Sequence, residues 1–272
     1  MAEPILLLAH SCLRNTDFSE RVRIAALCGF TAIGLNAGSV SNQTGEYQRL
    51  IDSGWTDEAM TATLNAAGMR IGELEALVIG NDQQARTFIR LAERFKVTTI
   101  QTIAWFSIED HGAPLNISSA VDWLRNFSDE VRAFGTRLAI EFIPTTPIPD
   151  ARSAQHIADL VDRANVGVCV DFWHVMRGKG VSELQQVDWK RVFNVQINDG
   201  QLVQADSNYI RDCLFNRLVP GDGQFPLDVL FASVPSDAPL NMEVMNRQLD
   251  EATSDQRCTI LSRGLMRSLA FR

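Results

Sequence analysis

The chain has 272 residues, 46% of them hydrophobic, and a formal net charge of −8 at pH 7. This length and apolar content allow a sizeable core, and the acidic balance argues against a nucleic-acid-binding surface. The opening MAEPILLLAH has no basic region, and its apolar run is too short for a signal peptide or a membrane span. Five scattered cysteines without CxxC spacing indicate reduced thiols, so we expect a cytoplasmic protein.

The hydrophobic pattern alternates between short apolar runs and helical periodicity along the whole chain. Strands are predicted at residues 5–9, 31–35, 69–78, 97–104, 137–143, 166–170, 192–197 and 240–244. Helices are predicted at residues 19–29, 56–67, 82–95, 118–134, 151–163, 226–233 and 251–269. No low-complexity linker divides the chain, so we expect one domain over residues 1–272.

Eight strands that alternate with helices predict parallel pairing and closure into a (β/α)₈ TIM barrel. A doubly wound open sheet is the competing architecture. It usually has a glycine-rich turn after its first strand, whereas this chain reads HSCLRNTD there. The barrel is therefore favoured, and its active site is expected where the strands end.

Four consecutive strands of the predicted barrel end with an oxygen-bearing side chain. These side chains are Glu141 in RLAIEFIP, Asp171 in VGVCVDFW, Gln196 in VFNVQIN and Glu243 in PLNMEV. One buried carboxylate is readily explained by a hydrogen bond or an ion pair. Three at one depth, with no lysine or arginine at these strand ends, predict a divalent metal. Oxygen donors without cysteine favour Mn²⁺ or Mg²⁺, with Co²⁺, Fe²⁺ or Zn²⁺ as substitutes.

The chain resembles the xylose-isomerase-like TIM barrels, a family often labelled sugar phosphate isomerase/epimerase. The resemblance covers nearly the whole chain and is carried by FSERVRIAALCGFTAIGLNAG, IEFIP, VDFWHVMRG, VQINDG, RLVPGDG and MEVMN. It implies that Glu141, Asp171, Gln196 and Glu243 bind one divalent metal, and that His174 and Arg217 contact substrate oxygens. Many members, such as the ketose 3-epimerases, have histidine where this chain has Gln196. Glutamine there is similar to hydroxypyruvate isomerases and 3-dehydroshikimate dehydratases.

The expected function is a metal-dependent isomerase or epimerase that acts on a small sugar or polyhydroxy carbonyl compound through an enediolate. Glu141 and Glu243 would transfer the proton, while His174 and Arg217 would stabilise the developing oxyanion. One alternative is a metal-dependent dehydratase of the 3-dehydroshikimate or inosose type, with His174 as the acid. A remote one is an endonuclease-IV-like DNA repair enzyme, which the net charge and the four histidines disfavour. A non-catalytic binding protein would be expected to lack a metal ligand or one of the two glutamates, and this chain keeps them all.

Other residues and properties stay open at this point. Arg217 is equally consistent with a surface ion pair to Asp212 or Asp222, and Glu75 with an ion pair to Arg70 or with support of the site. His10 and Asn36 end the first two strands and are candidate substrate contacts. We expect a small sugar-like substrate, no nucleic acid and no membrane partner. A homo-oligomer is left open.

Overall fold

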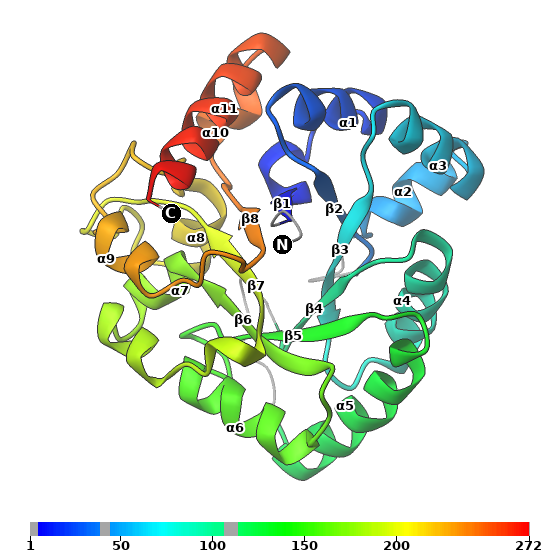
Figure 1. The fold of residues 1–272 in the computed structure, drawn as a ribbon, viewed down its shortest axis with the longest axis vertical. Helices are drawn as coiled ribbons and strands as arrows, with labels where there is room; N and C mark the ends of the chain where they lie inside the picture. Colours follow the sequence, from blue (N-terminus) through cyan, green and yellow to red (C-terminus); the bar gives the residue numbers. More distant parts are fainter. Residues whose placement is uncertain (1–4, 39–43, 106–113, 272) are drawn as a thin grey trace.

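The computed structural model describes residues 5–38, 44–105 and 114–271. Eight parallel strands form a closed barrel in chain order, and β8 pairs with β1 to close it (Figure 1). The strands are β1 (Leu6–Leu8), β2 (Ala32–Asn36), β3 (Ile71–Val78), β4 (Thr99–Ile103), β5 (Arg137–Glu141), β6 (Val166–Asp171), β7 (Val192–Ile197) and β8 (Leu240–Met242). The predicted (β/α)₈ barrel is confirmed.

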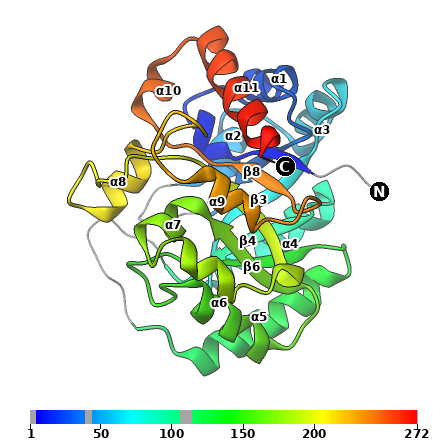
Figure 2. The same ribbon diagram turned by 60° about the vertical axis from the view of Figure 1, so that its left-hand side comes forward.

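The helices lie around the outside of the barrel, as Figure 2 shows from the side. They are α1 (Phe18–Leu27), α2 (Glu46–Asp52), α3 (Asp57–Ala66), α4 (Asp82–Phe95), α5 (Ile117–Arg132), α6 (Ala151–Val161), α7 (Phe172–Arg177), α8 (Tyr209–Phe215), α9 (Leu227–Ala232), α10 (Arg247–Glu251) and α11 (Ser254–Ala270). Three short 3₁₀ helices are η1 (His10–Leu13), η2 (Val181–Gln186) and η3 (Trp189–Arg191). None of the helices in the described part of the chain is long and apolar enough to cross a membrane.

The long helices begin where the sequence supplies a capping side chain. In α4 the Asn81 side chain accepts the backbone N–H of Gln84, and α6 opens with a reciprocal pair between Asp150 and Ser153. The apolar faces of these helices then pack on the strands, as Phe88 and Leu91 do from α4. These local signals explain why the predicted long helices are recovered.

The structure differs from the prediction in the segments that follow strands. Helices α2, α7, α8 and α10 were not predicted, because each has seven residues or fewer and too little periodicity to detect. The predicted closing helix over residues 251–269 is wrong at its start. Glu251 ends α10, and extended backbone at Ala252 and Thr253 separates it from α11. Thr253 then caps α11 through a reciprocal pair with Gln256.

The strand register staggers the polar side chains around the barrel. Glu141 on β5 pairs with Cys169 on β6, which lies two residues before Asp171. Asp171 pairs with Gln196, and Gln196 pairs with Asn241, which lies two residues before Glu243. Steps of two residues keep all of these side chains on the interior face of the sheet. The four polar side chains therefore lie on the same face of the sheet, but their positions shift along the barrel axis from strand to strand, as the tilt of barrel strands requires.

A buried carboxyl group also links strands on opposite sides of the barrel interior. The Glu73 side chain on β3 accepts hydrogen bonds from the side-chain amides of Asn194 on β7, at 2.5 Å, and Asn241 on β8, at 2.6 Å. All three residues are buried. Two residues further along β3, buried Glu75 accepts the backbone N–H of His10 at 2.9 Å. An ion pair between Glu75 and Arg70 is absent from the salt bridges of the described residues.

Asp199, just after β7, organises the loop that carries Arg217. Its Oδ1 accepts the backbone N–H groups of Gly200 and Phe225, and its Oδ2 accepts those of Gly221 and Gly223, all at 2.7–3.0 Å. A Cβ at residue 223 would lie 2.3 Å from Asp199 Oδ1, so this close approach requires glycine. The backbone of the PGDG turn, residues 220–223, therefore surrounds the Asp199 carboxylate.

The first prediction concerns Asp199. Its replacement by alanine leaves four backbone donors without their acceptor, and should lower the free energy of unfolding by about 2 kcal/mol or more. Asparagine keeps one side-chain oxygen but places an NH₂ group next to the other two backbone N–H donors. Asp199→Asn should therefore also destabilise the folded protein. Urea unfolding measures both, with the exposed Asp237→Asn as control. Wild-type stability in Asp199→Ala would mean that other contacts hold the loop.

The second prediction concerns the pH dependence of stability in the metal-free protein. Burial raises the pKa of Glu75 from 4.5 to about 7. Between these values the folded protein holds a proton that the unfolded chain releases, so stability falls as pH rises through this window. The contribution is about 3 kcal/mol, since one pKa unit corresponds to about 1.4 kcal/mol.

Glu75→Gln removes this titration. Its free energy of unfolding should therefore decrease less than that of the wild type between pH 5 and pH 8, measured by urea unfolding after chelator treatment. The exposed Glu93→Gln serves as the control and should follow the wild type. Parallel curves for Glu75→Gln and wild type would show that Glu75 is ionised in the folded protein throughout.

Candidate active site and metal-binding residues

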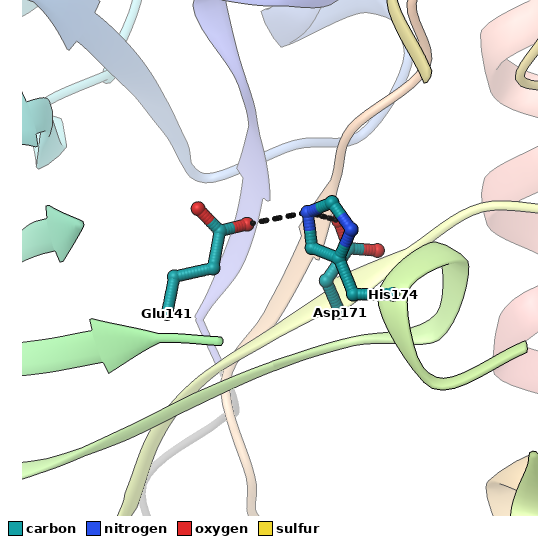
Figure 3. Close-up of side chains that lie close together, drawn as sticks. All are labelled: Glu141, Asp171 and His174. Carbon is teal, nitrogen blue, oxygen red and sulfur yellow. Dashed lines mark ion pairs between the residues drawn. The ribbon is translucent and has the colours of Figure 1, made fainter. Parts of the chain in front are cut away.

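Three predicted site residues meet where β5 and β6 end. His174 Nε2 lies 3.3 Å from Glu141 Oε1 and 3.3 Å from Asp171 Oδ2 (Figure 3). One ligand-type atom from each of the three side chains lies within 4.8 Å of the others, and all three residues are buried. The arrangement is that of a site able to hold a metal ion.

The local sequence explains why His174 faces Asp171. Asp171 ends β6 and is also the N-cap of α7, where its Oδ1 accepts the backbone N–H of Trp173 at 2.8 Å. The Asn198 side chain donates to the same oxygen at 2.7 Å. His174 follows Asp171 by three residues, which is about one helical turn, so its ring returns to the carboxylate.

Tyr209 on α8 contacts the second ring nitrogen of His174. Its hydroxyl is hydrogen-bonded to His174 Nδ1. Burial raises the pKa of Tyr209 well above its usual value, so the phenol stays protonated and can either donate to Nδ1 or accept from it. Nε2 lies 3.3 Å from a carboxylate oxygen of Glu141 and from one of Asp171, and these acceptors favour a hydrogen on Nε2. In this arrangement His174 is a proton donor beside the carboxylates.

Arg217 lies among the carboxylates. It is 1% exposed, and its Nη1 donates to Asp171 Oδ2 at 2.8 Å and to Glu243 Oε2 at 3.0 Å. The strand ends carry no lysine or arginine of their own, but the fold brings Arg217 to their carboxylates. The alternative of a surface ion pair for Arg217 is wrong. Asp212 pairs with Arg177 at 3.0 Å, and Asp222 with Arg263 and Arg267.

Glu141 and Glu243 have different neighbours. Glu141 Oε2 accepts the side-chain amide of Gln101 on β4 at 2.6 Å. Besides Arg217, Glu243 accepts the hydroxyl of Ser11 at 3.4 Å. Burial raises the pKa of Glu243 well above 4.5, and the Asp171 and Glu141 carboxylates add to this while Arg217 opposes it. One arginine does not balance this many buried carboxylates.

Gln196 fits the role of a neutral metal ligand. It is fully buried, its Oε1 accepts the Cys169 thiol at 3.2 Å, and its Nε2 has no hydrogen-bond partner. Because the oxygen and nitrogen of an amide exchange places on a half-turn of the terminal bond, this side chain can offer its oxygen instead. A buried amide with one unpaired atom beside Asp171 suits a cation.

Four of the six predicted site residues line a cavity of about 250 Å³ at the carboxyl ends of the strands. They are Glu141, His174, Arg217 and Glu243. Asp171 and Gln196 are fully buried. Glu75, Gln101 and His10 also line this cavity. Hydrogen-bonding groups and carboxylates thus lie on several sides of the cavity, and this composition suits a small polar molecule.

Sequence reasoning missed several residues that complete the site. Gln101 could have been found as a polar side chain in the middle of a strand whose five residues are all buried. Tyr209, Asn198 and Ser11 gave no comparable signal. Ser11 and Tyr209 lie in short helices after strands, and only the fold brings them to Glu243 and His174.

Curated relatives resemble part of the chain. The inosose isomerase of Bacillus subtilis (strain 168) is 31% identical over 113 residues, which is 40% of this chain and 39% of the relative. That of Bacillus licheniformis is 30% identical over 114 residues, or 41% of this chain and 40% of the relative. The chain thus matches about two fifths of the length of these relatives.

Solved structures resemble the whole chain at low identity. The IolI protein with a bound zinc atom has a TM-score of 0.80 at 17% identity and covers 98% of each chain. D-psicose 3-epimerase from Clostridium cellulolyticum H10 has a TM-score of 0.70 at 14% identity over 98% of each chain. The probable 3-DHS dehydratase AsbF from Bacillus anthracis has a TM-score of 0.69 at 16% identity, covering 96% of this chain and 97% of that one.

At these identities the structural neighbours establish the fold. Family membership rests on a wider match in sequence. The family model described as xylose isomerase-like TIM barrel matches residues 22–257. This span includes Glu141, Asp171, His174, Gln196, Arg217 and Glu243 and runs from α1 to the start of α11. The chain therefore belongs to the xylose isomerase-like TIM barrel family.

Proposed function

We propose that this protein is a divalent-metal-dependent isomerase or epimerase of a small sugar or polyhydroxy carbonyl compound. The observation that carries the proposal is the convergence of Glu141, His174, Arg217 and Glu243 on one cavity at the carboxyl ends of the strands. Two carboxylates, a histidine and an arginine around one small cavity are suited to moving a proton next to a carbonyl group. The curated relatives named inosose isomerase support the same class of reaction.

The charges favour a divalent cation held by Glu141, Asp171, Gln196 and Glu243. Three carboxylates are buried there, and Arg217 is the cation that contacts two of them. A bound divalent ion would act as a Lewis acid that makes the hydrogen beside a carbonyl more acidic. Oxygen ligands favour Mn²⁺ or Mg²⁺, and the zinc atom bound by the structural neighbour IolI supports a divalent metal in this protein as well.

The residues of the chain then have distinct roles. Glu141 and Glu243 line the cavity and are the candidates to remove and return a proton at carbon. Gln101 orients the Glu141 carboxylate through its 2.6 Å hydrogen bond. Arg217 supplies positive charge to an oxyanion that develops in the cavity, and its hydrogen bonds to Asp171, Glu243 and the backbone carbonyl of Cys213 keep it in place.

A dehydratase is the second candidate. The observation that favours it is the place of His174 on the cavity wall, with Nε2 3.3 Å from carboxylate oxygens of Glu141 and Asp171. A proton donor there is also what the loss of a β-hydroxyl as water needs. The masses of the products separate the two reactions, because isomerisation conserves mass and dehydration removes one water.

The third prediction concerns metal content. Purified protein should carry about one divalent ion per chain, and Asp171→Ala should lose it, because a fully buried anionic ligand is removed. Elemental analysis after dialysis measures this, with the exposed Asp228→Ala as a control for protein handling. Stoichiometric metal in folded Asp171→Ala would place Asp171 outside the coordination shell. Full activity of metal-stripped wild type would contradict the metal dependence.

The fourth prediction concerns proton transfer by Glu141 and Glu243. With a turned-over substrate in D₂O, the wild type should exchange the hydrogen on the carbon beside the carbonyl. Glu141→Gln or Glu243→Gln keeps the shape and one oxygen ligand but removes the base. Each should slow this exchange on the order of a hundredfold, the range typical of general acid–base catalysis. Exchange is followed by NMR.

Metal content is measured on the same samples, so that loss of the ion is separated from loss of the base. A glutamine variant that holds metal and exchanges at the wild-type rate excludes that residue as the base. If both variants do so, the proton-transfer mechanism is wrong and the cavity serves another reaction.

A further inference from the structure

A second cavity of about 330 Å³ adjoins the first one near the ends of β1 and β2. We call it the distal lobe; it is lined by His10, Arg14, Asn15, Asn36, Thr44 and Arg49. His10, Arg14 and Asn36 line both cavities, so the two spaces lie next to each other. A ligand held beside Glu141 and Glu243 can therefore extend into the distal lobe.

The two spaces differ in whether carboxyl groups line them. The first cavity is lined by the carboxyl groups of Glu75, Glu141 and Glu243. Among the described residues, the lining of the distal lobe contains two arginines, a histidine, two asparagines and a threonine but no carboxylate. Every one of these six side chains can donate a hydrogen bond. The distal lobe is thus built to receive oxygen acceptors.

The two arginines differ in whether their charge is already neutralised. Arg14 donates to both oxygens of Asp250 and to the backbone carbonyl of Leu214. Arg49 donates to the backbone carbonyl of Thr44, and no ion pair of Arg49 occurs among the described residues. Arg49 is therefore a cation on the wall of the lobe that has no ion-pair partner among the described residues. Burial raises the pKa of Glu46, and the charge of Arg49 opposes that rise.

His10 provides a second indication that something binds here. It is 8% exposed, and its Nε2 has no hydrogen-bond partner. Glu46 Oε2 is 3.6 Å away, beyond hydrogen-bond distance, and also has no hydrogen-bond partner, whereas Glu46 Oε1 pairs with Arg21 at 2.7 Å. A buried ring nitrogen without a partner is costly unless a ligand or water satisfies it.

We propose that the distal lobe binds an oxyanion, a phosphate or a carboxylate, carried by the substrate at the end remote from its reacting carbons. Arg49 is the residue that recognises its charge, and His10 and the asparagines contact its oxygens or the adjacent hydroxyls. Charge-assisted hydrogen bonds from arginine are the strong contacts for such groups. The proposal rests on the proposed function of the first cavity, since it names the class of substrate that would span both.

The fifth prediction tests the lobe without turnover. Inorganic phosphate is titrated into metal-loaded protein by calorimetry, and acetate in parallel shows which oxyanion is preferred. Arg49→Gln should weaken binding of the preferred ion on the order of tenfold or more, and Arg49→Lys should retain most of it. The exposed Arg86→Gln is the matched control, because it removes the same charge from the surface of α4. Equal affinity in wild type and Arg49→Gln, or no binding of either ion, overturns the proposal.

Kinetics separate failure of this proposal from failure of the proposed function. Ketoses with and without a terminal phosphate or carboxylate are compared as substrates. Arg49→Gln should raise KM for the charged compounds at least tenfold and leave kcat largely unchanged, because Arg49 lies away from the reacting carbons. Turnover of neutral sugars with the same KM as the charged ones contradicts the distal lobe but keeps the isomerase. Phosphate binding that depends on Arg49, without turnover of any sugar, keeps the lobe and contradicts the isomerase.

Discussion

The site depends on Asp171, a fully buried carboxylate that satisfies four groups at once. One oxygen accepts hydrogen bonds from the backbone N–H of Trp173, in the first turn of α7, and from the side-chain amide of Asn198. The other oxygen contacts His174 and Arg217. Burying an ionised carboxylate is tolerated only when it is hydrogen-bonded or paired this fully. The same residue therefore ends β6, starts α7 and fixes the positions of His174 and Arg217, which face the cavity.

Excess negative charge is the second constraint on this end of the barrel. The pKa values of Glu73, Glu75 and Glu243 are all raised, first of all by burial. Without a further cation these groups favour their protonated forms, and a divalent ion would reverse that preference for the residues it touches. Stability and metal affinity are thus coupled through the same carboxylates. Metal binding would explain why this region retains buried charges, which apolar residues could replace in a core with a purely structural role.

The fold places these charges by geometry that does not depend on loops. Parallel strands present alternate residues to the interior, and the barrel closes them around one axis (Figure 1). Loop residues then add specificity. Arg217 comes from the turn wrapped around Asp199, Tyr209 from the short helix α8, and Arg49 from α2. The strands supply the acidic side chains, and the segments between the strands supply the arginines and hydrogen-bond donors around them.

The sequence by itself determined the barrel and the residues that end its strands. Alternating strand and helix patterns indicate βα units, and an acid at the end of an apolar run, as at Glu141 or Glu243, points to the mouth of a barrel. Only the tertiary structure decided what those acids contact. Arg217 and Asp171 are 46 residues apart and Tyr209 and His174 are 35 apart, yet each pair is in contact. Hydrophobic periodicity reports local geometry, whereas an ion pair between a strand and a distant loop depends on where the barrel closes and how the loop folds back.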